Sequence, residues 1–127
     1  MTLHDIYTQF DNCKFWEERY RLLIQLSRKL PRPTEEQLTV WAEIPGCESR
    51  LWFELTTQPR QIHAYSEARL MQGLLFILIT ALHEADNDGW RQFDVQKLFD
   101  ELQIARNLTA TKLNGLMKIQ EIVRQAR

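Results

Sequence analysis

Residues 68–82 read ARLMQGLLFILITAL and constrain the fold more than any other segment of this chain. When the segment is drawn as a helix, apolar residues occupy nearly its whole circumference, which is typical of a helix packed on several sides. Residues 74–79 alone also suit a buried strand, because a short apolar run fits both structures. The length of the segment and the helical spacing of Arg69, Gln72 and Thr80 favour the helix.

Polar residues mark the predicted ends of this helix and of two later ones. Ser66 is predicted to cap the long helix, with Glu67 in its first turn where a carboxylate favours the helix dipole. The sequence DNDG at residues 86–89 is predicted to end it as a solvated turn. Asp94 is predicted to cap a short helix that runs to residue 102, and Thr109 to cap the last helix. The expected core-facing residues of the last helix are Leu113, Leu116, Ile119 and Val123.

The N-terminal part is predicted to form two helices. Residues 12–30 carry an apolar stripe at three- and four-residue spacing. The stripe consists of Trp16, Tyr20, Leu23, Leu26 and Leu30. Pro31 and Pro33 are expected to end this helix, because proline removes a backbone donor and restricts the residue before it. Residues 3–10 are predicted to form a shorter helix, and residues 31–37 a connector.

The middle of the chain predicts strands. Residues 40–44, 50–57 and 61–65 are rich in β-branched and aromatic residues, and residues 58–60 suit a hairpin turn. The predicted fold class is therefore α+β, with a small antiparallel sheet of about three strands packed against several helices. A length of 127 residues suits one domain, residues 1–127.

Charge and hydropathy argue against two classes of partner. The chain has 16 basic and 17 acidic residues, so it lacks the positive field that attracts nucleic acid. The longest apolar run, residues 73–79, is far short of the ~20 residues that span a membrane. The opening sequence MTLHDIYTQF lacks the pattern of a signal peptide, which predicts a reducing cytoplasm in which thiols stay free.

The segment IPGCESRLW, residues 44–52, places a cysteine on a predicted loop. Gly46 permits a positive φ and leaves space for a second molecule beside Cys47. A thiol is nucleophilic as its thiolate, which a nearby cation such as Arg50 favours and Glu48 opposes. A packed, inert thiol is the alternative, because free cysteine is among the residues most often buried.

The other candidate ligands are dispersed. Cys13 is expected to pack at a helix end, and a disulfide between Cys13 and Cys47 is not expected in the cytoplasm. His4, His63 and His83 show no metal-ligand spacing, and DNDG lacks the ligand pattern of a calcium loop, so no metal is predicted. No phosphate-binding or hydrolase signature is present, and no cofactor of its own is predicted.

The loop sequence resembles the SufE family of sulfur-acceptor proteins, whose hallmark is Gly-Cys-x-Ser/Asn-x-Val/Leu-Trp. WEERYRLLIQLSRKLP at residues 16–31 is similar to the family's first long helix. SEARLMQGLL at residues 66–75 is similar to the opening of its central helix, and residues 93–116 to its closing region. Two features are closer to the CsdE branch of the family: Ser66-Glu67 together with Arg69, and the motif LFDEL. The motif FDVQ is closer to the SufE type, so the sequence does not decide between the two branches.

The resemblance implies a fold shared with iron–sulfur scaffold proteins and a role in sulfur transfer. Cys47 would accept sulfane sulfur from a cysteine desulfurase that depends on pyridoxal phosphate (PLP), and the PLP would belong to that partner. A downstream acceptor such as an iron–sulfur scaffold would follow. The residues expected to shape the loop are Pro45, Gly46, Glu48, Ser49, Arg50 and Trp52. The residues expected near the partner are Glu67, Arg69 and Lys112, the last standing where relatives usually have arginine.

A loop that serves as a carrier is expected to protect its thiol at rest. Trp52, and Leu51 or Phe53, are the predicted cover for Cys47, and docking is expected to swing the loop outward with Pro45 and Gly46 near the hinge. Two other functions remain open from the sequence. One is a non-catalytic interaction module with Cys47 merely packed, and the other is a thiol redox sensor.

Overall fold

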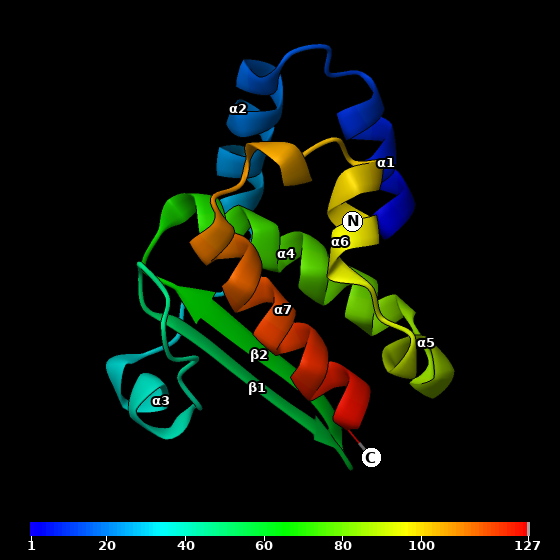
Figure 1. The fold of residues 1–127 in the computed structure, drawn as a ribbon. Coiled ribbons are helices and arrows are strands. Elements are labelled where there is room, and N and C mark those ends of the chain that lie inside the picture. The colour runs from blue at the N-terminus through cyan, green and yellow to red at the C-terminus, as the bar shows by residue number, and fades with distance from the viewer. Residues whose placement is uncertain (127) are drawn as a thin grey trace.

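The computed structural model describes residues 1–126 and confirms the α+β class. These residues form seven α-helices, one short 3-10 helix and one two-stranded antiparallel sheet. The elements in chain order are α1 (Leu3–Asp11), α2 (Trp16–Ser27), α3 (Glu35–Val40), β1 (Leu51–Thr57), β2 (Arg60–Ser66), α4 (Arg69–Glu84), α5 (Asn87–Arg91), α6 (Val95–Glu101), η1 (Ala105–Asn107) and α7 (Ala110–Gln125). Figure 1 shows α4 in the middle, with α1, α2 and α6 on one side of it and the hairpin and α7 on the other.

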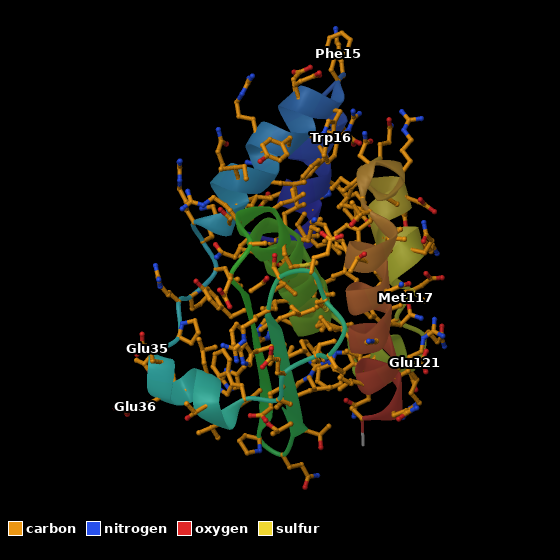
Figure 2. The ribbon with its side chains drawn as sticks, turned by 60° about the vertical axis from the view of Figure 1, so that its left-hand side comes forward. Phe15, Trp16, Glu35, Glu36, Met117 and Glu121 are labelled. Carbon is orange, nitrogen blue, oxygen red and sulfur yellow. The ribbon has the colours of Figure 1, made fainter. Side chains whose placement is uncertain are left out.

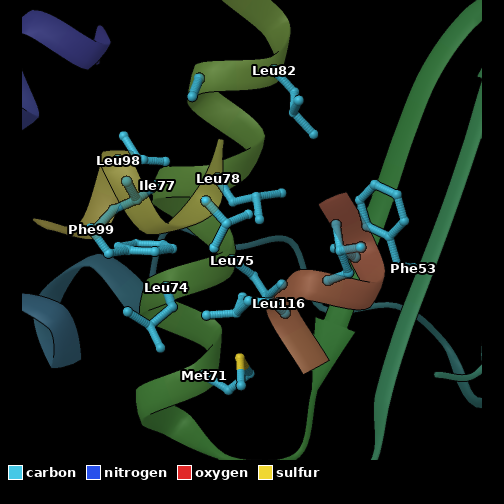
Figure 3. Packing of buried hydrophobic residues seen from close by; sticks show 14 of the residues in the cluster. Phe53, Met71, Leu74, Leu75, Ile77, Leu78, Leu82, Leu98, Phe99 and Leu116 are labelled. Atoms are coloured by element: carbon cyan, nitrogen blue, oxygen red, sulfur yellow. The ribbon is translucent and has the colours of Figure 1, made fainter. Parts of the chain in front are cut away.

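Helix α4 is the centre of the core, and the helical interpretation of residues 74–79 is confirmed. Its buried residues face in several directions, as the sequence predicts for a helix packed on more than one side. Figure 3 shows them between α6, with Phe99, and the opposite layer, with Phe53 of β1 and Leu116 of α7. Gly73 allows α2 to pack closely, because a Cβ there would lie 2.3 Å from the backbone oxygen of Leu23.

The sheet is smaller than the sequence predicts. Strands β1 and β2 pair from Leu51 opposite Ser66 to Thr57 opposite Arg60. The predicted strand at residues 40–44 is replaced by the end of α3 and one isolated bridge between Glu43 and Trp52.

The cause of this difference is a helix-capping sequence in the predicted connector. Thr34 accepts a hydrogen bond from the backbone N–H of Gln37, and the Gln37 side chain accepts one from the Thr34 N–H. Glu35 and Glu36 add negative charge in the first turn. The capping box therefore starts a helix that runs to Val40, the first residue of the predicted strand.

The first helices differ from prediction at their ends and on one face. Helix α2 begins at Trp16, not at residue 12, and ends at Ser27, before the prolines. Leu23, Leu26 and Leu30 are buried as predicted, but Tyr20 is 45% exposed. Phe15, which precedes α2, projects from one end of the molecule in Figure 2.

Arg19 takes a buried position on α2 that the apolar stripe does not reveal. Its guanidinium donates hydrogen bonds to the carbonyl of Cys13 and to the side-chain oxygen of Gln103. A planar group with five donors satisfies acceptors from two separate segments, which makes its burial possible.

Of the three predicted helix caps, two are confirmed and one is wrong. Asp94 and Thr109 cap α6 and α7 as predicted. The predicted cap Ser66 is wrong, because Ser66 ends β2 and α4 begins only after Ala68. Residues 86–89 open the short helix α5, since Asp86 accepts a hydrogen bond from the N–H of Gly89.

Candidate functional site

The loop that carries Cys47 joins the isolated bridge to β1 and depends on the backbone of Gly46. Gly46 has φ +79°, as the sequence predicts for this loop. This left-handed conformation is costly for residues that carry a Cβ. The base of the loop is closed by a hydrogen bond from the N–H of Ile44 to the carbonyl of Leu51. The sequence therefore folds into a tight bend with the cysteine near its tip.

The thiol of Cys47 is half-buried against α7. A Cβ placed on Gly115 would lie 2.9 Å from the Cys47 Sγ and 3.2 Å from a methyl carbon of Leu51. Gly115 thus forms a seat for the thiol, and Leu51 is the predicted cover residue that the structure brings to it. Free space beside the thiol is about 10 Å³, close to the size of one water molecule. The lining residues are Cys47, Glu48, Ser49, Ser66, Ala68, Met71, Thr111 and Lys112.

Lys118 is a cation near the thiol that the sequence did not predict as part of the site. Its Nζ donates a hydrogen bond of 2.6 Å to the carbonyl oxygen of Pro45, 73 residues earlier. Burial raises the pKa of the Cys47 thiol above its ordinary value; Lys118 lowers this pKa and Glu43 raises it. Because burial is the largest of these effects, Cys47 rests as a neutral thiol at neutral pH.

Arg50 does not approach Cys47, which corrects the prediction made from their spacing. Its guanidinium forms two hydrogen bonds with the carboxylate of Glu43, at 2.9 and 3.1 Å. Glu67 lies 3.9 Å from the same guanidinium, which stacks 4.6 Å from the ring centre of Trp52. Arg50 therefore fixes the end of the loop against the strand, and the cations close to the thiol niche are Lys118 and Lys112.

Trp52 lies away from the thiol. Neighbouring residues of a strand point to opposite faces, so Leu51 and Trp52 cannot both cover Cys47. The Trp52 ring is buried, and its centroid is 6.3 Å from that of Tyr65. The Trp52 ring packs against the Arg50 guanidinium instead.

Of the three residues predicted to meet the partner, Lys112 lines the thiol niche, whereas Glu67 and Arg69 follow its lining residues Ser66 and Ala68 in the chain. Lys112, in the first turn of α7, holds its Nζ 3.6 Å from a carboxylate oxygen of Glu48 on the loop. The N–H of Glu67 donates to the carbonyl of Arg50, which places Glu67 beside the end of the loop. Arg69 is exposed at the start of α4, and its side chain has no polar partner among residues 1–126.

The remaining candidates are separate from this niche. Cys13 lies in the connection between α1 and α2, where its Sγ donates to the carbonyl of Gln9 at 3.6 Å. His63 stacks on Trp41 with ring centres 4.9 Å apart. No group of three or more metal-ligating side chains occurs in the described part of the chain. None of the helices described is long and apolar enough to cross a bilayer.

Comparison with known proteins gives matches along nearly the whole chain. A family model described as "SufE: Fe-S metabolism associated domain" matches residues 4–126. An uncharacterized SufE-like protein of Haemophilus influenzae is 40% identical over 114 residues, covering 87% of this chain and 90% of the relative. The sulfur acceptor protein CsdE of Escherichia coli is 34% identical over 126 residues, covering 97% of this chain and 86% of CsdE.

Proposed function

The chain belongs to the SufE family, and from this premise we propose that it accepts sulfane sulfur from a PLP-dependent cysteine desulfurase onto Cys47. The observation that carries the proposal is the setting of Cys47 at the tip of a bend, half-buried in a niche against Gly115. The similarity to a protein named as a sulfur acceptor supports the same role. The PLP belongs to the desulfurase, and this chain acts as its activator by removing the persulfide.

The proposed reaction is a transfer between two thiols. The Cys47 thiolate attacks the outer sulfur of the desulfurase persulfide, and the bond between the two sulfurs of that persulfide breaks. The desulfurase cysteine leaves as its thiolate, and Cys47 becomes the persulfide. One S–S bond forms as another breaks, so no external oxidant or reductant is needed. The rate depends on the thiolate fraction of Cys47, the leaving group and access.

Access requires the loop to move. A space of about 10 Å³ beside Cys47 admits one small atom but not the cysteine of a partner protein. The seat on Gly115 also leaves the thiol neutral, because burial raises its pKa. Moving the loop outward, with the bend at Pro45 and Gly46, would expose and solvate the thiol in one step. Lys112, which lines the niche, together with Glu67 and Arg69 forms the surface we propose for contact with the desulfurase.

Intact mass tests the proposal directly. After incubation with a cysteine desulfurase and cysteine, the chain should gain one or more sulfur atoms that a reductant removes. Cys47→Ser should gain none, should still bind the desulfurase and should not stimulate it. Cys13→Ser is the matched control, since it removes the other thiol, and it should gain sulfur normally.

The same measurement separates the alternatives. A chain that gains oxygen under peroxide, but no sulfur from the desulfurase, is a redox sensor, and one that gains neither is an interaction module. Full stimulation by Cys47→Ser would refute the carrier mechanism. The destination of the sulfur, such as an iron–sulfur scaffold, is tested afterwards by transfer from the isolated persulfide form.

A further inference from the structure

Helix α7 presents three residues to the Cys47 loop at regular spacing. Lys112, Gly115 and Lys118 are three residues apart, so they lie along one face of the helix. Gly115 is the seat of the thiol, and each lysine contacts the loop on one side of it. Thr111 of α7 also lines the niche, whereas Figure 2 shows Met117 and Glu121 projecting from the outer side of the helix.

Lys118 makes the stronger of the two contacts. Its ammonium donates to the Pro45 carbonyl at 2.6 Å, which is short for a hydrogen bond of this kind. Gly46 leaves the room for this approach, because a Cβ there would lie 3.1 Å from the Lys118 Nζ. The glycine therefore serves two purposes, the bend itself and the access of the lysine to the bend.

Lys112 makes the weaker contact on the other side of the thiol. Its Nζ is 3.6 Å from the Glu48 carboxylate, which is 53% exposed, so water screens the pair. Between Pro45 and Ser49 the loop makes no other hydrogen bond or ion pair within residues 1–126. Two polar contacts thus hold the loop tip in position, and both are with α7.

We propose that Lys118 is a positioning residue for Cys47: by holding the Pro45 carbonyl it keeps the thiol on its Gly115 seat until a desulfurase docks. Lys112 is a second, weaker tie through Glu48. The role in sulfur transfer rests on the proposed function, but the hold on the loop is a property of the free chain. Since Lys118 is exposed, water or a partner group can replace the Pro45 carbonyl, so the hold is reversible.

Alkylation of the free chain measures the hold without any desulfurase. The background is Cys13→Ser, so that iodoacetamide reports on Cys47 alone. Lys118→Met removes the ammonium and keeps the length of the side chain, and it should raise the alkylation rate roughly fivefold, as expected for the net loss of one typical, solvent-exposed hydrogen bond. Lys118→Arg should restore the slow rate, because arginine also donates to a single carbonyl.

Lys97→Met is the matched control. Lys97 is exposed on α6, and its side chain has no polar partner among the described residues. It removes one positive charge from the surface without touching the loop, and its alkylation rate should equal that of the background. The proposal fails if Lys118→Met and Lys97→Met react at the same rate. Sulfur uptake by Cys47 could still stand after that result, so the two failures are distinguishable.

The pH profile of alkylation separates positioning from a simple effect of charge. The charged groups around the thiol are Lys118 and Glu43, together with the Glu48–Lys112 pair. If Lys118 acted only as a nearby cation, Lys118→Met would move the midpoint to higher pH and slow the reaction at neutral pH. If Lys118 holds the loop, release solvates the thiol, so the midpoint moves down towards that of an ordinary thiol and the rate rises. The two roles give opposite signs, and a midpoint that moves up overturns the proposal.

Discussion

Two buried helical glycines in this chain have different neighbours. A Cβ on Gly73 of α4 would meet the backbone oxygen of Leu23 at 2.3 Å, where α2 crosses α4. A Cβ on Gly115 of α7 would meet the Sγ of Cys47 at 2.9 Å, at the end of a side chain on a loop. In both places the missing Cβ is the space that another segment occupies.

The difference lies in what could move if that space were filled. The Leu23 backbone is held in α2, whose apolar side is buried in the core, so it cannot yield without separating two helices. Cys47 sits on a bend whose tip has few polar ties to the rest of the chain. A missing Cβ therefore gives a fixed contact at Gly73 in the core, whereas at Gly115 the loop that carries Cys47 can move away. Substitution to alanine tests each side of this comparison.

Gly73→Ala should have the largest effect on the fold. Alanine stabilises a helix interior by about 1 kcal/mol over glycine, but forcing a methyl against a backbone carbonyl costs more, since overpacking typically costs about 1–3 kcal/mol and this contact is a severe one. We expect a net loss of roughly 2 kcal/mol in the free energy of unfolding, measured by urea denaturation. An unchanged urea midpoint would show that α2 yields as easily as the loop, and the comparison would not hold.

Gly115→Ala should leave the fold stable and release the thiol. The gain of about 1 kcal/mol in helix propensity offsets part of the strain, and the Cys47 side chain can move away. We expect unfolding free energy within about 1 kcal/mol of the parent and alkylation of Cys47 roughly tenfold faster, a factor that corresponds to about 1.4 kcal/mol. Both are measured in the Cys13→Ser background. Slow alkylation, together with a stability loss like that of Gly73→Ala, would mean that the seat is as rigid as the core.

The comparison also shows which features the sequence could predict. The helical pattern of α4, the bend at Gly46 and the place of Cys47 on a loop follow from local residues, because period, glycine and turn chemistry act over a few positions. Gly115 and Lys118 contact residues 68 and 73 positions away from them in the chain, and no local pattern marks either one as part of the site.

The errors near the site have a related cause, which is competition among partners. Arg50 is close to Cys47 in sequence, but Glu43 offers it a bidentate carboxylate, the better partner for a planar guanidinium. Ser66 has the residue type of a helix cap, but its hydroxyl donates to the Arg50 carbonyl at the end of β2. In each case a contact from another segment replaces the local one that the residue type favours.

The smallest expected effect is a pH dependence of the free energy of unfolding, which should arise from the packing of the Cys47 thiol against Gly115 and not from the Gly73 contact. Burial raises the pKa of Cys47 in the folded chain. A group whose folded pKa is raised adds stability below its unfolded pKa, about 8.5 for a thiol, and loses it as the pH rises through the folded value. In the Cys13→Ser background, the parent should therefore lose stability relative to Cys47→Ser as the pH rises above about 8.5.

The two glycine variants then decide whether this pH dependence comes from the seat. Gly115→Ala removes the seat, so its thiol is solvated and its urea midpoint, compared with the same variant carrying Cys47→Ser, should show no such decline. Gly73→Ala leaves the seat in place, so the decline should persist on a lower baseline. A decline that survives Gly115→Ala would mean that the thiol stays buried against a methyl group, and the loop would then be as tightly packed as the helix crossing at Gly73.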